Sequence, residues 1–204
     1  MNSTKGDLRR TALLDAAERV LVTAGNNNAT MRHFAAASNV SVGHLQHYFP
    51  ARTDLMRAVL DRVLQRSLAW LRDTASIDLH PDGASRSTAP ISRDDSSRMV
   101  AAIMQQQNDP TVVRLYVEIW AMAAADEEIA EVLRDFYRQY AHYVELVVQR
   151  AQPELAAEVR QAKAHSVVAI FEGAAIVSAG FAGLRSEGSD TSLLGAIQHL
   201  IHES

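Results

Sequence analysis

Four side chains that can read DNA bases lie near the start of the chain: Arg32, His44, Gln46 and His47. The amide group of glutamine can form two hydrogen bonds with adenine, and a guanidinium group can form two with guanine. The ring nitrogens of histidine can bond to base edges or to phosphate oxygens. This part of the sequence therefore offers the chemistry needed to recognise double-stranded DNA.

Two short helices joined by a tight turn are predicted to carry these side chains. Thr30 can cap the first helix, and Ser41 is a good N-cap for the second, at about 42–48. Between them, Asn39 tolerates the left-handed conformation that a sharp turn requires. Pro50 ends the second helix, because residues before a proline are pushed out of the helical region. Such a pair is a helix-turn-helix, at about 30–49, whose second helix enters the major groove.

The second helix of this pair is expected to be amphipathic. Leu45 and Phe49 should face inward, together with Val40 just before the helix. Tyr48 and Arg52, at its end and beyond, are placed to reach phosphates. The positions expected to be exposed are Val42, His44, Gln46 and His47.

The rest of the chain is also predicted to be helical, so the fold class is all-α. The first segment, about 7–24, has an apolar residue every three or four positions, and Gly25 follows its end. No segment shows the alternation of a strand. A Ser-, Asp-, Pro- and Gly-rich stretch, 75–95, is typical of a mobile loop. Further helices are expected at about 53–73, 96–107, 111–124, 127–151, 154–184 and 190–202.

Composition restricts the classes of function. There is no cysteine, which excludes disulfides, thiolate zinc sites and cysteine nucleophiles. The patterns of nucleotide-binding loops, α/β-hydrolase nucleophiles and zinc proteases are missing, so we expect no enzyme and no cofactor. The chain also lacks a signal peptide and a run of 18 apolar residues, so a cytoplasmic protein without membrane contact is expected.

Charge is distributed unevenly along the chain. Residues 1–66 hold nine Lys and Arg against five Asp and Glu, a balance of +4, whereas residues 67–204 hold eleven against nineteen, a balance of −8. The formal net charge of the whole chain is −4. This asymmetry predicts a small basic module that meets a polyanion, attached to an acidic body that does not.

The run TMRHFAAASNVSVGHLQHYFPARTDLMRAVL resembles the DNA-binding domain of TetR-family repressors. The resemblance covers about residues 8–60. Asn39 replaces the usual turn glycine, Arg52 a lysine, Gln46 a phosphate-binding tyrosine and His44 a common threonine. The resemblance implies a three-helix DNA-binding domain at 1–53. Together with the chemistry above, it gives these expected DNA contacts: Thr30, Arg32, His33, Ser41, Val42, Gly43, His44, Gln46, His47, Tyr48 and Arg52.

For residues 54–204 the resemblance implies a helical bundle that forms a homodimer and binds a small-molecule effector, whose identity is unknown. The segment 164–184 is almost wholly apolar, as expected of a helix buried on every side, and its small residues permit close helix approach. The segment 109–135 resembles the BetI-like subgroup. The expected effector pocket draws on Met104, Tyr116, Glu118, Trp120, Tyr143, Phe171 and Glu172.

Each of these assignments has an alternative. His142 and Glu145 share one helix face, but a metal-binding bundle needs several carboxylate–histidine sets, so no metal site is expected. The aromatic residues of the body are more often core than pocket residues, and 164–184 can be the central helix of a monomer. The leading hypothesis is a dimeric, ligand-responsive repressor. A transcriptional activator, an adaptor that has lost DNA binding and an enzyme built on a helical bundle are the alternatives.

Overall fold

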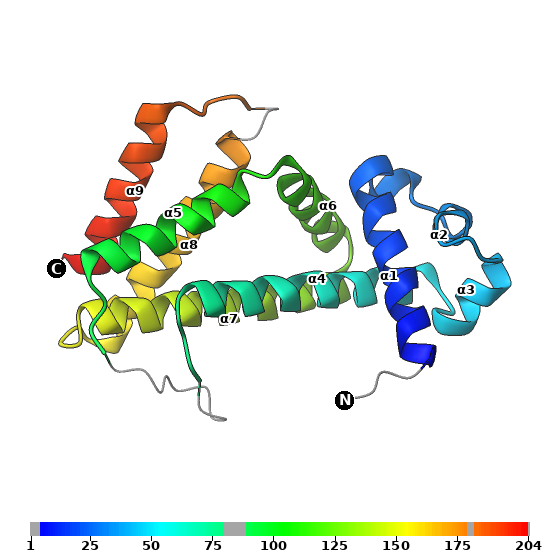
Figure 1. Cartoon of the computed structure of the whole chain (residues 1–204), viewed down its shortest axis with the longest axis horizontal. Helices are drawn as coiled ribbons and strands as arrows, with labels where there is room; N and C mark the ends of the chain where they lie inside the picture. Colours follow the sequence, from blue (N-terminus) through cyan, green and yellow to red (C-terminus); the bar gives the residue numbers. More distant parts are fainter. Residues whose placement is uncertain (1–4, 80–88, 179–181, 204) are drawn as a thin grey trace. The chain divides into compact units, whose positions relative to one another are not determined.

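The computed structural model describes residues 5–79, 89–178 and 182–203 (Figure 1). Within these residues the secondary-structure elements are all helices, which confirms the all-α prediction. A short 3-10 helix, η1, spans Asn26–Asn28. The α-helices are α1 (Lys5–Ala24), α2 (Met31–Ala37), α3 (Val42–Tyr48), α4 (Arg52–Thr74), α5 (Arg93–Gln107), α6 (Pro110–Ala125), α7 (Glu127–Ala151), α8 (Ala157–Ser178) and α9 (Glu187–His202).

The chain forms two compact units. The first contains 1–65 and 114–133, and the second contains 66–113 and 134–204. The boundaries between the units fall inside α4, α6 and α7. The predicted functional division, 1–53 and 54–204, stays a prediction.

The core of the first unit explains why its short helices hold together. Leu21 of α1, Phe34 of α2, Leu45 of α3 and Leu55 of α4 are all completely buried. Burying a side chain of this size stabilises a fold by roughly 1.5–3 kcal/mol relative to leaving it exposed. Each short helix thus depends on its apolar face, since helices of seven residues are not stable alone.

An ion-pair cluster fastens α1 to α4 in the same unit. The guanidinium group of Arg62 lies 2.5 Å from a carboxylate oxygen of Asp15 and 3.1 Å from one of Glu18. It also donates a hydrogen bond to the carbonyl of Thr11. A partly buried arginine that reaches two carboxylates fixes the register between two helices better than an exposed pair would.

In the second unit, α5, α8 and α9 pack against one another. Their buried apolar residues include Val100, Val167, Phe171, Ile197 and Ile201. The predicted helix 154–184 is shorter than expected: α8 begins at Ala157 and is described to Ser178, while 179–181 lie outside the described residues. Beyond them, Gly183 has a positive φ of 67°, which is incompatible with a continuing helix.

The start of α9 and the preceding loop also differ from expectation. The helix begins at Glu187 rather than 190, because Ser186 and Ser189 cap each other's backbone in a capping box. Of the expected loop 75–95, residues 80–88 lie outside the described part of the chain. The described remainder is not helical until α5 begins at Arg93, after the N-cap Ser92.

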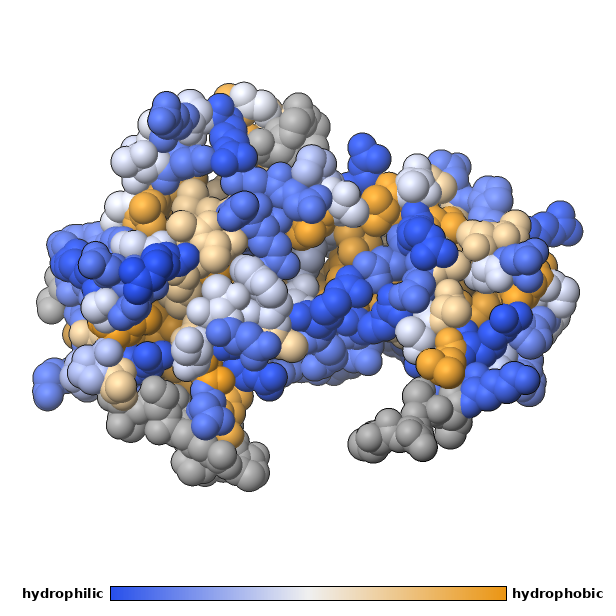
Figure 2. All heavy atoms as spheres, viewed as in Figure 1, coloured by the Kyte–Doolittle hydropathy of each residue, from blue (hydrophilic) through white to orange (hydrophobic). Residues whose placement is uncertain are grey.

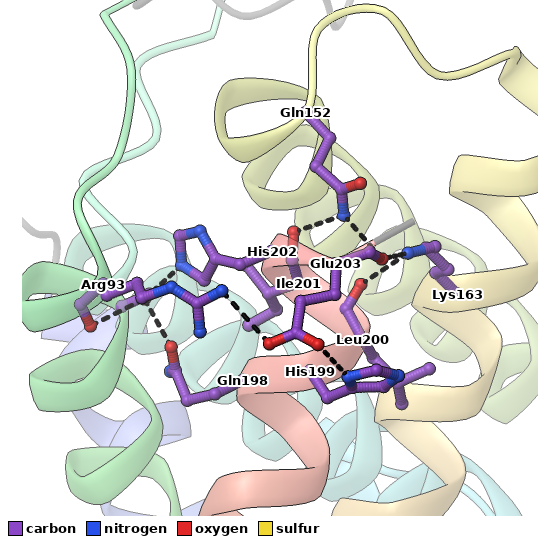
Figure 3. Close-up of polar contacts among 10 residues, drawn as sticks. Arg93, Gln152, Lys163, Gln198, His199, Leu200, Ile201, His202 and Glu203 are labelled. Carbon is purple, nitrogen blue, oxygen red and sulfur yellow. Dashed lines mark hydrogen bonds and ion pairs between the residues drawn. The ribbon is translucent and has the colours of Figure 1, made fainter.

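Polar contacts fasten the end of α9 to its neighbours (Figure 3). The buried hydroxyl of Ser96 on α5 lies 3.0 Å from the side-chain oxygen of Gln198 and 2.8 Å from Nε2 of His202. The side-chain amide of Gln152 donates to the carbonyl oxygen of Ile201. These bonds hold the last turns of α9 against α5 and against residue 152, just after α7.

Candidate nucleic-acid interface

The turn between α2 and α3 has the geometry that Asn39 makes possible. Asn39 adopts a positive φ of 53°. The backbone N–H of Val40 then donates to the carbonyl of Ala35 at 3.0 Å, which closes the turn. An asparagine is one of the few residues with a side chain that adopts this conformation at little cost.

Two hydroxyl groups begin the two helices. The side-chain oxygen of Thr30 accepts the backbone N–H of His33 at 3.3 Å, and that of Ser41 accepts the backbone N–H of His44 at 3.1 Å. Nδ1 of His33 also lies 2.6 Å from the carbonyl oxygen of Asn28. Each cap contributes about 1 kcal/mol, a large share for a seven-residue helix. Thr30 and Ser41 therefore have a structural role whether or not they touch DNA.

The face of α3 opposite the core is open to solvent. Leu45 is fully buried, whereas Gly43, His44, Gln46 and His47 are exposed. A β-carbon added at Gly43 would meet no atom within 4 Å. Arg32 and His33 of α2 are exposed as well, while Val42 and Tyr48 are half-buried at the edges of this face.

Three rings form a continuous patch on α3. The ring centres of His44 and Tyr48 lie 5.6 Å apart, and those of His47 and Tyr48 lie 5.3 Å apart, both with edge-on geometry. This contact gives the two imidazoles a common support and limits their rotamers. The patch can present ring nitrogens and a hydroxyl group in fixed positions.

A basic end of α1 was missed by the sequence reasoning. The guanidinium carbon of Arg10 lies 5.1 Å from the ring centre of Phe49, the residue that follows α3. The start of α1 therefore lies beside the end of α3, and it also carries the exposed cations Lys5 and Arg9. The clustering of these cations was the available signal, but nothing in the sequence shows where α1 begins in space.

Arg52 and Glu118 both contact the segment that follows α1. The guanidinium of Arg52 donates to the carbonyl oxygens of Ala29 and Asn26 at 2.8 and 2.9 Å. One carboxylate oxygen of Glu118 accepts the backbone N–H of Asn26 at 2.8 Å. Glu118 thus lies beside the helix-turn-helix in the first unit, although sequence reasoning assigned it to the effector pocket.

The other residues of the expected pocket are divided between the two units. Tyr116 and Trp120 belong to the first unit with Glu118, whereas the remaining four belong to the second. There, Tyr143 and Phe171 line a narrow apolar cavity of about 20 Å³ between α4, α5, α7, α8 and α9. A volume of this size holds no more than about one water molecule.

Met104 lies instead on an open groove between α5 and the start of α9, with a volume of about 540 Å³. Leu194 and Arg185 line the same groove. Figure 2 shows a mostly hydrophilic surface on this face of the molecule, with apolar atoms reaching the surface between α5 and α9. Its volume is in the range of small-molecule sites, but its open form differs from the enclosed pocket that the sequence predicts.

The carboxyl group of Glu172, in the second unit, has a strongly raised pKa. Burial raises the pKa of Glu172 to about 7, partly offset by a hydrogen bond that the Tyr137 hydroxyl donates at 3.1 Å. Its other carboxylate oxygen accepts a longer bond, 3.4 Å, from the side-chain amide of Gln107. Because the pKa is about 7, the group exists in both protonation states near neutral pH.

The described residues contain no group of three or more His, Asp or Glu side chains arranged to hold a metal ion. None of the described helices combines the length and apolar character that crossing a membrane requires.

Two models of known protein families match parts of this chain. Residues 13–59 match the family model for bacterial regulatory proteins of the tetR family. Residues 92–187 match the model for the C-terminal part of BetI-type transcriptional repressors. The two matches lie on both sides of the segment 60–91 and together take in the helix-turn-helix and most of the second unit.

Individual proteins are similar over most of the chain. An uncharacterized HTH-type transcriptional regulator in the dhlA 5' region of Xanthobacter autotrophicus is 27% identical over 173 residues, which are 82% of this chain and 77% of that protein. The HTH-type transcriptional regulator BetI of Cronobacter sakazakii is 23% identical over 171 residues, 81% of this chain and 77% of that protein. A transcriptional regulator of Pseudomonas aeruginosa PAO1 has the same fold, with a TM-score of 0.76, 20% identity and coverage of 95% and 90% of the two chains.

Proposed function

Because this chain belongs to the TetR family of transcriptional regulators, which are not enzymes, we propose that it is a ligand-responsive repressor. In this proposal a homodimer binds a pseudo-palindromic operator in the cytoplasm. The observation that carries the proposal is the geometry of α3. A helix capped by Ser41 is anchored by Leu45 and Phe49 and turns Gly43, His44 and Gln46 toward solvent.

The proposed base contacts come from the exposed face of α3. Gln46 reads an adenine through its amide, while His44 and His47 bond to base edges or phosphates. Arg32 of α2 bonds a guanine or a neighbouring phosphate. The proposed interface also includes Thr30, His33, Ser41, Val42, Gly43 and Tyr48.

Dimerisation is proposed to use α8 and α9. Among their exposed residues are Ala169 and Gly173 on α8 and Gly195 and Ala196 on α9. An added β-carbon at Gly173 or Gly195 would meet nothing within 4 Å in the single chain. Val177 is also 42% exposed, although 164–184 was expected to be buried on every side. A second copy would cover these positions and permit close helix approach.

The proposed effector binds in the second unit, near Tyr143, Phe171 and Glu172. Because the cavity there is about 20 Å³, the bundle must open to admit a ligand. A ligand that binds better to the opened form shifts the population of the dimer toward that form. Repression is relieved if the opened form holds the two recognition helices at a spacing that does not fit DNA.

The test is selection of DNA followed by a binding series. The purified protein is incubated with fragments of its own genome, and retained duplexes are measured by gel shift at several salt concentrations. We expect roughly nanomolar affinity that weakens steeply with salt. Gln46→Ala should lower discrimination at one base pair by about 1–3 kcal/mol while preserving binding to other variants of the site.

The result also separates the alternatives. If no fragment is retained, the adaptor hypothesis replaces the repressor hypothesis. If fragments are retained, a reporter gene placed behind one of them distinguishes a repressor from an activator by the sign of its response.

A further inference from the structure

The segment 25–29, which joins α1 to the helix-turn-helix, is held from two sides by charged side chains from distant parts of the chain. We propose that Arg52 and Glu118 are positioning residues for DNA recognition. They act through this segment, and contact with a phosphate or with the effector is not their role. The inference rests on the proposed DNA-binding function.

Arg52 is already engaged by the protein. Its Nε donates to the carbonyl oxygen of Ala29 at 2.8 Å, and one terminal nitrogen donates to the carbonyl oxygen of Asn26 at 2.9 Å and to the side-chain oxygen of the same residue. This arrangement needs a planar group with several donors in a fixed fork. A lysine at this position would keep the charge but could not form the same set of bonds.

Glu118 holds the other side of the segment. Its Oε2 accepts the backbone N–H of Asn26 at 2.8 Å in a partly buried hydrogen bond. Its Oε1 lies 3.0 Å from the place where a β-carbon of residue 25 would be. The φ of 72° favours glycine at position 25, and the missing side chain leaves room for the carboxylate to approach.

These contacts connect both ends of the helix-turn-helix. Ala29 directly precedes Thr30, the cap of α2, and Arg52 is the first residue of α4, just beyond the end of α3. The guanidinium group thus links the start of the helix-turn-helix to its end. Because Glu118 belongs to α6, it ties the same segment to a helix that lies 92 positions away in the chain.

Salt dependence distinguishes a positioning arginine from one that contacts phosphate. The probe is a duplex that the wild-type protein selects from a random pool, and the measurement is the slope of the logarithm of affinity against the logarithm of salt concentration. Each phosphate contact contributes about 0.9 to this slope. Arg52→Ala and Arg52→Lys should both lower affinity about tenfold or more, because bonds from a charged group are lost, and both should keep the wild-type slope.

Arg32→Ala is the matched control, because Arg32 is exposed on the neighbouring helix and is a proposed DNA contact. If Arg32 bonds a phosphate, its removal from both protomers should reduce the slope by about two. If it reads only a guanine, discrimination at one base pair falls. The inference is wrong if Arg52→Lys keeps wild-type affinity, or if Arg52→Ala reduces the slope.

For Glu118 the readout is amide exchange at Asn26, whose N–H donates to its carboxylate. Glu118→Ala should speed exchange at Asn26 and weaken binding of the selected duplex about tenfold. Glu118→Gln keeps an oxygen acceptor and should restore most of both. The control is Glu131→Ala, which removes an exposed acid of the same unit and should change neither.

The outcomes separate the two claims. Faster exchange at Asn26 with unchanged DNA affinity would mean that the contact is structural only, and would overturn the inference while leaving DNA binding intact. Faster exchange at Asn26 together with weaker DNA binding by a correctly folded Glu118→Ala, both rescued by glutamine, supports it. If the wild-type protein selects no duplex at all, the proposed function fails and the inference fails with it.

Discussion

The side chains of α3 divide their work between folding and recognition. Leu45 and the cap Ser41 hold the helix, while His44 and His47 share the support of the Tyr48 ring. We therefore expect substitutions at Leu45 and Ser41 to destabilise the protein, because they remove buried apolar contacts or a cap, and substitutions at the exposed His44 and His47 to leave its stability nearly unchanged. Gly43 belongs to neither group, since it has no side chain and faces open space.

Gly43→Ala tests whether DNA approaches this position closely. In a helix, alanine is more stable than glycine by roughly 0.8–1 kcal/mol, and the added methyl group meets nothing in the protein. We therefore expect an unchanged or slightly higher unfolding temperature together with weaker DNA binding. Thermal unfolding and gel shift on the same preparation check both, and wild-type affinity would exclude a close contact at Gly43.

Glu172 predicts an unusual pH dependence of stability. Its folded pKa, about 7, is raised above the ordinary value of 4.5, so its contribution is fully present below pH 4.5 and is lost as pH rises through about 7. Glu172→Gln removes the ionisable group. The variant should be more stable than the wild type at pH 8, by at most about 3 kcal/mol, and should lose this advantage toward pH 5. Urea unfolding at both pH values measures the difference, and an equal difference at both would contradict the assignment.

At the scale of helices, most of the fold could be predicted from sequence. The bounds of α3 and the caps Thr30 and Ser41 follow from local rules, because apolar spacing and capping act within a few residues. The end of α8 was missed, since its apolar run continues past Ser178 while the backbone at Gly183 leaves the helical region.

In the candidate site, features set by nearby residues could be predicted from the sequence, whereas contacts between distant residues could not. The exposed face of α3 was predictable because side chains three or four positions apart lie on the same face of a helix. The partners of Arg52 and Glu118 were not, because Glu118 and Asn26 are 92 positions apart in the chain. A glutamate within an apolar run gives the same signal whether it faces a ligand or a backbone amide.

The exposed stripe of α8 can be tested by a single change. Gly173→Arg adds a long charged side chain where the single chain leaves space, so the protomer should fold normally. If α8 forms the dimer interface, the variant should be monomeric at micromolar concentration and should lose most of its affinity for DNA. Sedimentation measures the mass. Gln139→Arg, an exposed position on α7, is the control and should stay dimeric.

For the whole molecule, we expect the effector to act by changing the spacing between the two recognition helices of the dimer. Half-sites that are one helical turn apart, about 10–10.5 base pairs, face the same side of the duplex. Insertion of five base pairs between the half-sites of a selected operator should abolish tight binding, because one half-site then faces the opposite side. Insertion of ten should restore the facing but not the distance, so affinity should recover only in part.

Equal affinity for all three duplexes in a gel-shift titration would show that one protomer binds alone. That result would leave the assignment of α3 as the recognition helix in place and remove the homodimer from the proposal.

The close approach of Glu118 to Gly25 also restricts which residues can occupy these two positions during evolution. A β-carbon at position 25 would lie 3.0 Å from the carboxylate, whereas the positive φ of Gly25 favours glycine whatever residue stands at 118. Among homologous genes, glycine at 25 should therefore persist where position 118 changes, whereas a lineage with a side chain at 25 should lack glutamate at 118.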